Sequence, residues 1–230
     1  MVIKVFLDSA SQEEMAEYGH LVQGFTTNPT LLRKAGVSNY EAWARETCGL
    51  VGDKPISFEV VADDHQEMLR QAMVINEWGS NVFVKIPITN TEGRSSAAVI
   101  RKLSRSGVKV NVTAITTMRQ TKDAVKALDN SAKAILSVFA GRIADTGVDP
   151  RSTMRHAVKH TRPFRGFDVL WASPRQVLDI DMAERCGVDI ITVSAAILAK
   201  RALKGKDLTE YSRETVEQFY RDATLSGYTV

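Results

Sequence analysis

Short runs of β-branched and apolar residues alternate with longer amphipathic segments from one end of this sequence to the other. Such an alternation is typical of repeated βα units, which build a parallel sheet. We expect strands at Ile3–Leu7, Val22–Thr26, Ile56–Val61, Asn81–Ile86, Lys109–Thr113, Ala134–Phe139, Asp168–Ala172 and Asp189–Ser194. Eight such units match a closed α/β barrel of the (β/α)8 TIM type better than an open doubly wound sheet.

The segments between these runs carry signals of helix ends. Ser11 with Glu14 three residues later has the pattern of a capping box, and Thr91 before Glu92 indicates another helix start. Three glycines stand where a helix would stop just before the next strand: Gly79, Gly107 and Gly187. No linker rich in Pro, Gly or Ser divides the chain, so we expect one domain over residues 1–230.

The composition excludes several classes of protein. Of the 230 residues, 44% are hydrophobic and 25% charged, which is ordinary for a globular domain. The 30 basic and 27 acidic residues leave a net charge of +3 and are interspersed, so nothing indicates a nucleic-acid partner. No apolar run approaches the ~18 residues of a membrane span. The start of the chain reaches Asp8 before it builds a signal-type apolar stretch, so we expect an unprocessed protein without membrane association.

The two cysteines, Cys48 and Cys186, lie far apart and have no partner at metal-ligand spacing. They predict neither a disulfide framework nor a zinc site, and the reducing cytoplasm is the expected compartment. After the eighth unit, a surplus helix is expected over about residues 208–224. Its apolar positions favour packing either on its own barrel or on a neighbouring subunit, and the sequence does not separate the two.

Polar residues recur at the carboxyl ends of the predicted strands, where barrels of this type carry their chemistry. The ends of seven strands supply, in order, Asp8; Thr26, Thr27 and Asn28; Glu59; Lys85; Asn111 and Thr113; Ser137, followed by Arg142; and Ser173. These side chains are therefore expected to converge at one mouth of the barrel.

Lys85 is the most informative of them, because it stands inside an apolar strand whose two faces are normally covered. Burial disfavours an ammonium, and a neutral amine can attack a carbonyl carbon to form a Schiff base. The alternative is a structural lysine, either in a buried ion pair with Asp8 or Glu59 or with its amine at the strand end.

Asp8 and Glu59 would supply the carboxylates that the proton transfers of Schiff-base chemistry need, although either could instead be a helix cap. Asn111 and Thr113 are two apart on one strand and therefore point to the same side. There they could hold sugar hydroxyls or simply fill a polar core.

Four motifs stand in order on these strands: Gly24-Phe25-Thr26-Thr27-Asn28-Pro29-Thr30, Phe83-Val84-Lys85-Ile86-Pro87, Asn111-Val112-Thr113-Ala114 and Ser137-Val138-Phe139-Ala140-Gly141-Arg142. Together they resemble the transaldolase family, specifically its short branch that includes the fructose-6-phosphate aldolases. The resemblance implies a metal-free class I aldol mechanism on a (β/α)8 barrel, with the lysine on the fourth strand and no organic cofactor.

The resemblance also implies roles for individual residues. Lys85 would be the Schiff-base nucleophile, Asp8 the acid/base, and Glu59 with Thr113 would place the catalytic water. The substrate-binding residues it implies are Thr26, Asn28 and Asn111 for the dihydroxyacetone portion, and Ser137 and Arg142 for hydroxyls and the phosphate. Phe139 paired with Glu59 resembles the transaldolases, since the aldolases carry tyrosine and glutamine at these positions.

One segment departs from the family pattern. After strand seven the family usually has Ala-Ser-Phe-Lys/Arg, whereas this chain reads Trp171-Ala172-Ser173-Pro174-Arg175-Gln176. The simplest alignment deletes the second phosphate-binding cation and leaves Arg175 opening the next helix. Arg142 and Ser173 would then hold the far end of the substrate beside the apolar surface of Trp171, and Arg175 would compensate only if its helix turns toward the mouth.

These observations predict a transaldolase-like transferase that moves a three-carbon dihydroxyacetone unit from a ketose to an aldehyde acceptor through an imine on Lys85. The expected partners are sugars or sugar phosphates and further copies of the chain, because short members of the family often form pentamers or decamers. Two alternatives stay open: an aldolase that releases free dihydroxyacetone, and a sugar-phosphate-binding barrel without catalysis.

Overall fold

Eight parallel strands form a closed barrel in the computed structural model, which describes residues 2–228. The strands are β1 (Lys4–Asp8), β2 (Gly24–Thr26), β3 (Ile56–Glu59), β4 (Val82–Pro87), β5 (Val110–Ile115), β6 (Ala134–Val138), β7 (Phe167–Trp171) and β8 (Ile190–Val193). Each strand pairs with the next in sequence, and β1 pairs with β8. The predicted (β/α)8 barrel is confirmed, and each predicted strand overlaps an observed one.

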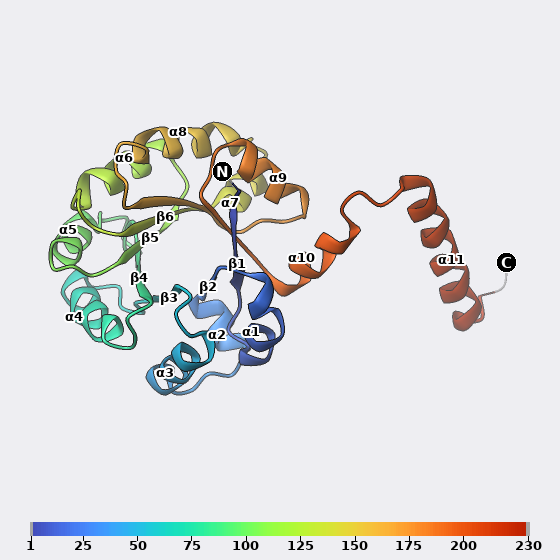
Figure 1. Ribbon diagram of the computed structural model, residues 1–230, viewed down its shortest axis with the longest axis horizontal. Helices are drawn as coiled ribbons and strands as arrows, with labels where there is room; N and C mark the ends of the chain where they lie inside the picture. The colour runs from blue at the N-terminus through green and yellow to red at the C-terminus, as the bar shows by residue number, and fades with distance from the viewer. Residues whose placement is uncertain (1, 229–230) are drawn as a thin grey trace. The chain divides into compact units, whose positions relative to one another are not determined.

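Helices follow the strands and surround the barrel (Figure 1). They are α1 (Gln12–Tyr18), the 3-10 helix η1 (Gly19–Leu21), α2 (Pro29–Lys34), α3 (Tyr40–Val51), α4 (His65–Asn76), α5 (Ala97–Arg105), α6 (Met118–Ala127), α7 (Ala140–Asp145), α8 (Arg151–Thr161), α9 (Leu178–Arg185) and α10 (Ala195–Lys200).

The predicted helix ends are correct in part. Ser11 caps α1 by accepting a hydrogen bond from the backbone N–H of Glu14, but the Glu14 carboxylate accepts from Ser9 instead of returning to the cap. Gly107 and Gly187 have positive φ directly after α5 and α9, as a helix stop requires.

The helix start predicted at Thr91 is wrong, because α5 begins at Ala97. Thr91 lies in the preceding loop, where its backbone N–H and its hydroxyl both donate to the Asp63 carboxylate. A hydroxyl residue before a glutamate therefore stabilises a loop here rather than a helix.

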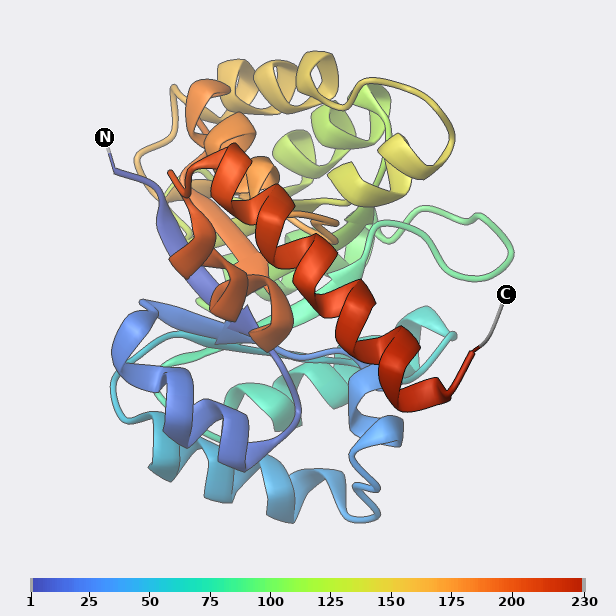
Figure 2. The same cartoon turned by 90° about the vertical axis from the view of Figure 1, so that its right-hand side faces the viewer.

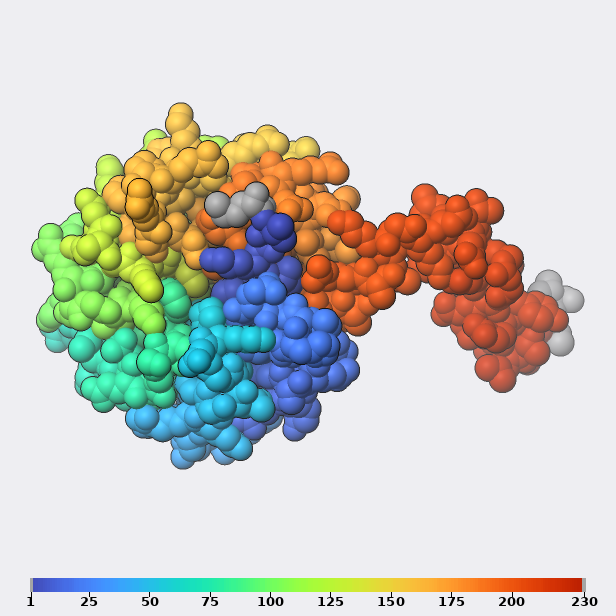
Figure 3. All heavy atoms as spheres, in the orientation of Figure 1, coloured from blue at the N-terminus to red at the C-terminus, as the bar shows by residue number. Residues whose placement is uncertain are grey.

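The core follows from strands that are covered on both faces. All five residues of β6 are buried between the barrel interior and the outer helices. Inside the barrel, a cluster of Phe6, Ile135, Leu170 and Ile190 fills the space below the carboxyl ends of the strands. Gly24 gives Phe6 its room, since a Cβ there would come within 2.6 Å of the phenyl ring. Figure 3 shows the closely packed heavy atoms of the barrel and its helices in the same orientation.

Contacts divide the chain into two compact units, one ending at Leu198 and the other beginning at Ala199. The second unit contains the end of α10, the 3-10 helix η2 (Arg201–Leu203) and helix α11 (Leu208–Ser226), seen as a continuous helix in Figure 2. Asp207 caps α11 by accepting from the N–H of Glu210. The surplus helix predicted from residue 208 is thus present. No described helix is long and apolar enough to cross a membrane.

Candidate active site

A cavity of about 400 Å³ opens at the carboxyl ends of the strands. Every strand contributes a side chain to its wall: Asp8, Thr26, Glu59, Lys85, Thr113, Ser137, Leu170 and Thr192, in the order β1 to β8. A second residue of β5, Ala114, and residues of loops and helices complete it: Asn28, Pro29, Thr30, Leu31, Phe139, Arg142, Ala172 and Ser173. The convergence predicted from the strand ends is therefore present for these residues, with the eighth strand added, but Thr27 and Asn111 do not line the cavity.

Lys85 lies at the inner wall of this cavity and is 5% exposed. Its Nζ donates to the carbonyl oxygen of Thr27 at 2.6 Å and lies 2.9 Å from Oε2 of Glu59. The parallel register places Glu59 directly beside Lys85 on the neighbouring strand, so the pairing follows from the β3–β4 ladder. Lys85 therefore forms the buried ion pair with Glu59 that the sequence left open as an alternative, and it also faces the cavity.

Asp8 lies at the end of β1 within the same wall. Its carboxylate accepts from Thr26 Oγ1 at 2.7 Å and is 3.5 Å from Nδ2 of Asn28. Burial raises the pKa of Asp8, and the nearby positive charge of Lys85 and the hydrogen bond from Thr26 only partly offset this increase. Thr26 Oγ1 also lies 2.6 Å from Thr192 Oγ1, so a row of hydroxyls leads to this carboxyl group.

Thr113 faces the cavity from β5, and its buried Oγ1 has no hydrogen-bond partner within residues 2–228. The next residue, Ala114, has φ +60° and sits where the register between β5 and β6 shifts by one residue. A bulge of this kind bends the strand and redirects side chains next to it. Thr113 thus offers a free hydroxyl to whatever fills the cavity.

Ser173 lines the cavity just after β7 and has a left-handed conformation, with φ +57°. The backbone of Gly141 approaches it so closely that a Cβ there would lie 1.5 Å from the Ser173 carbonyl oxygen. The glycine is therefore required for α7 to begin beside the end of β7. Two non-glycine residues with positive φ, Ala114 and Ser173, flank the same cavity, and backbone strain of this kind gathers at functional sites.

Arg142, on α7, and Phe139, at its start, line the outer part of the cavity. Asn111 lies beneath the wall, fully buried, where it accepts from Ser137 Oγ at 2.7 Å and donates to Ser57 Oγ at 3.1 Å. Asn111 therefore orients Ser137 rather than reaching the cavity.

Two further predicted residues do not line the cavity. Trp171 is buried within β7. Arg175 precedes the helix that it was expected to open, since α9 begins at Leu178. Its guanidinium is bound to Asp145 at the end of α7, with Nε donating to Oδ1 at 3.1 Å and Nη2 to Oδ2. The hydrogen bonds from Arg175 lower the pKa of Asp145.

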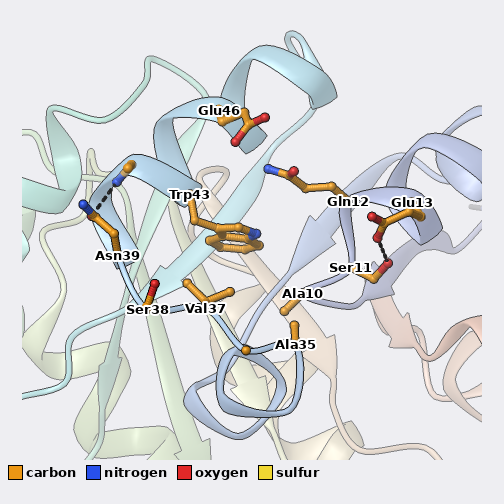
Figure 4. Close-up of a pocket in the computed structure, with 12 residues that line it drawn as sticks. Ala10, Ser11, Gln12, Glu13, Ala35, Val37, Ser38, Asn39, Trp43 and Glu46 are labelled. Carbon is orange, nitrogen blue, oxygen red and sulfur yellow. Dashed lines mark hydrogen bonds between the residues drawn. The ribbon is translucent and has the colours of Figure 1, made fainter.

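A second hollow, of about 450 Å³, lies between the β1–α1 loop and the α2–α3 turn (Figure 4). The Trp43 ring lies between Gln12 and Val37 in this view. Among the described residues, its lining contains the carboxylates Glu13 and Glu46 but no Lys, Arg, His or Cys side chain. Because the lining of this second hollow supplies no amine and no cation, the strand-end cavity is the one of the two that is equipped for Schiff-base chemistry on a carbonyl compound.

Two further residues have contacts in the site, although the sequence does not single them out. Thr192 is a hydroxyl residue inside the apolar strand Ile190–Val193, and its position near a strand end was a usable signal. Tyr40 contacts the backbone of Glu59 from helix α3, and nothing in the sequence links the two.

The arrangement combines an amine, two carboxylates and several hydroxyls in one pocket. An amine beside a carboxylate can add to a carbonyl group and lose water to form an imine, and a second carboxyl group can exchange a proton with a substrate hydroxyl. These are the elements of Schiff-base aldol chemistry.

Comparisons with known proteins agree with this chemistry. The chain is similar to proteins named probable transaldolase from Dehalococcoides mccartyi, with 37% identity over 85% of this chain and 88% of the relative, and from Streptococcus agalactiae, with 36% identity over 83% and 86%. A similarly named protein of Methanococcus maripaludis is 34% identical over 86% and 89%.

Among solved structures, KGPDC from Streptococcus mutans superposes with a TM-score of 0.59 at 12% identity, over 84% of this chain and 88% of that protein. This similarity concerns the barrel fold alone. The sequence profile of the family described as "Transaldolase/Fructose-6-phosphate aldolase" matches residues 5–227. The resemblance inferred from the four motifs is therefore confirmed, and the chain belongs to the transaldolase/fructose-6-phosphate aldolase family.

Proposed function

We propose that this protein is a transaldolase-like transferase that moves a three-carbon dihydroxyacetone unit from a ketose to an aldehyde acceptor through an imine on Lys85. Family membership supports the transaldolase type of activity. The observation that carries the assignment to this site is the position of Lys85 Nζ, buried at the wall of the cavity and 2.9 Å from the Glu59 carboxylate.

Lys85 is the proposed nucleophile. Its Nζ adds to the C2 carbonyl carbon of the ketose, and the carbinolamine loses its hydroxyl as water to leave the imine. Glu59 lies close enough to accept a proton from the amine and to return one, directly or through a water held by Thr113 Oγ1.

Asp8 is the proposed acid/base for carbon–carbon cleavage. It takes the proton from the C4 hydroxyl as the C3–C4 bond breaks, the aldehyde leaves, and the electron pair is held as an enamine on the Lys85 nitrogen. The raised pKa of Asp8 brings it closer to the working pH than an ordinary carboxyl group, which suits a group that must also give the proton back. Attack of the enamine on a second aldehyde and hydrolysis of the new imine complete the transfer.

The remaining cavity residues are proposed to bind the substrate. Thr26, Asn28 and Ser137 present hydroxyl and amide groups to the dihydroxyacetone portion, and Asn111 acts by holding Ser137. Arg142 and Ser173, with the ring of Phe139, receive the far end of the sugar or sugar phosphate. Trp171 and Arg175 then influence binding only by fixing the wall and the loop that carries Ser173.

We propose in addition that the chain forms a homo-oligomer, a pentamer or decamer, in the cytoplasm. Helix α11 has no buried residue and exposes Phe219 and Tyr220 to 65% and 75%. Apolar surface of this extent on a helix favours a partner. Both cysteines are free thiols, which suits a reducing compartment. Light scattering of the wild type and of Phe219→Glu tests the oligomer, and an unchanged mass of the variant contradicts the role of this helix.

The proposed activity is tested by following fructose 6-phosphate with and without glyceraldehyde as acceptor. Rapid consumption only when the aldehyde is present supports a transferase. Release of free dihydroxyacetone at the same rate without an acceptor identifies an aldolase. Binding of the sugar without turnover or a covalent adduct identifies a barrel that only binds.

A further inference from the structure

The backbone of Glu59 lies just beyond the point where strand β3 loses its partner on one side. The last residue pair between β2 and β3 is Thr26 with Ser57, after which the chain turns into α2. On the other side, Glu59 remains in register with Lys85 of β4. Its N–H and C=O groups that face the β2 side therefore need a partner from elsewhere, since unpaired backbone groups in a half-buried strand are costly.

The phenol of Tyr40 supplies that partner. Its oxygen accepts from the Glu59 N–H at 3.0 Å and donates to the Glu59 carbonyl oxygen at 3.1 Å. Burial raises the pKa of Tyr40, so the hydroxyl keeps the proton that it donates. One side chain thus replaces both hydrogen bonds that a neighbouring strand would have made.

Tyr40 is itself held in place. It is the first residue of α3, whose N-terminus is capped by Asn39. Its ring packs edge-on against Trp78 at 5.0 Å between centroids and against Phe58 at 6.3 Å. The hydroxyl is therefore presented to Glu59 from a rigid aromatic cluster rather than from a mobile loop.

We propose that Tyr40 is a positioning residue for the reaction, which fixes the carboxylate of Glu59 beside Lys85 by capping the end of strand β3. This inference rests on the proposed function, because it gives Tyr40 a kinetic effect only if Glu59 handles protons for Lys85. The titratable side chains that face Glu59 are Lys85 from β4, Tyr40 from α3 and, in the same electrostatic environment, Asp8 from β1.

The test compares Tyr40→Phe, which removes only the hydroxyl, with two controls. Tyr18→Phe removes a hydroxyl from α1, outside the cavity lining. Trp78→Phe loosens the aromatic cluster but leaves the Tyr40 hydroxyl in place. For each variant, kcat, KM and the pH profile of transfer are measured, together with Tm and borohydride trapping of dihydroxyacetone on Lys85.

We expect Tyr40→Phe to lower kcat about five- to tenfold, the effect of losing one or two hydrogen bonds, with KM changed less than about twofold. The pH profile of kcat should shift, because Glu59 is no longer held against Lys85. Tyr18→Phe should leave all parameters unchanged, and Trp78→Phe should lower Tm with a smaller effect on kcat and the pH profile than Tyr40→Phe. In a Glu59→Gln background, Tyr40→Phe should cost much less than in the wild type.

Two outcomes overturn the inference while the proposed function stands. One is a Tyr40→Phe enzyme whose Tm falls but whose kcat and pH profile match those of the wild type. The other is an equal loss of kcat from Tyr40→Phe with and without Glu59. Failure of the wild type to trap dihydroxyacetone on Lys85 is a different result, which overturns the proposed function itself.

Discussion

The amine of Lys85 and the carboxylate of Glu59 lie 2.9 Å apart on adjacent parallel strands, with both side chains largely removed from solvent. The ladder between β3 and β4 fixes this distance, and the carbonyl oxygen of Thr27 receives a second hydrogen bond from the same amine. A buried pair of this kind adds little net stability, yet removal of one member leaves an uncompensated charge. The stability of the protein is therefore expected to be sensitive to the loss of either member of this pair.

Replacement of Glu59 tests that sensitivity. We expect Glu59→Ala to lower the free energy of unfolding by about 3 kcal/mol, because Lys85 would stay buried without its partner. Glu59→Gln should cost less, since an amide oxygen can still accept from the amine. Urea denaturation measures both. Glu92→Ala, which removes an exposed partner of Arg94, is the control and should change stability little. A Glu59→Ala protein as stable as the wild type would contradict the pairing.

The stability of Asp8 variants should depend on pH. Burial raises the pKa of Asp8 above its value in the unfolded chain, so the folded protein binds more protons between these two values. The group therefore costs stability as pH rises through that range. Asp8→Asn should raise Tm at pH 7, and the gain should vanish as pH falls below about 4.

Asp145→Asn should change Tm at pH 7 in the opposite direction to Asp8→Asn. The hydrogen bonds from Arg175 lower the pKa of Asp145, so its contribution to stability is present at neutral pH and is lost on acidification. Tm should thus fall at pH 7 in Asp145→Asn.

For Asp8, the contradicting outcome is a decrease of Tm at pH 7 in Asp8→Asn. That result would show that the hydrogen bonds of Asp8 with Thr26 and Asn28 outweigh the burial of its charge.

Phe139→Tyr should change the fate of the covalent intermediate. The ring lines the outer cavity, and a hydroxyl there can deliver or orient water that hydrolyses the imine before an acceptor arrives. We expect release of free dihydroxyacetone without acceptor to rise roughly tenfold or more. Phe164→Tyr, in a ring pair outside the cavity lining, is the control. A wild type that already releases dihydroxyacetone as fast as it transfers it would refute the role of Phe139.

The far end of the substrate is expected to be held by Arg142 without help from Arg175. Arg175 is bound by Asp145, so Arg175→Ala should change kcat/KM only slightly, through the loop that carries Ser173. A phosphorylated ketose should have little advantage over its unphosphorylated analogue. Arg142→Ala should cost less than about tenfold in kcat/KM, below a full charge-assisted contact. A large preference for sugar phosphates, lost equally in both variants, would show instead that Arg175 completes the anion site.

Much of the fold followed from local patterns. Strands that are buried on both faces read as apolar runs, and Lys85 is conspicuous because it interrupts one of them. The convergence of strand ends then brought Asp8, Glu59 and Thr113 to one cavity, as expected of a parallel barrel.

Contacts between segments far apart in the chain could not be predicted from local sequence patterns. Tyr40 meets Glu59 only because β2 ends early and α3 begins beside the exposed edge, a relationship that no local pattern encodes. The ion pair between Arg175 and Asp145 depends on the path of the loop after β7, which local sequence patterns do not specify. The left-handed backbone at Ala114 is likewise imposed by the register shift between β5 and β6, since alanine has no preference for it.

Borohydride trapping tests the central claim most directly. The protein is incubated with a ketose or with dihydroxyacetone, reduced, and analysed by intact mass and peptide mapping, with Lys85→Ala in parallel. We predict one covalent adduct of the carbonyl compound on the peptide that contains Lys85, and none in the variant. An adduct on another lysine, or turnover by the wild type without any trapped species, would contradict the assignment of Lys85 as the Schiff-base nucleophile.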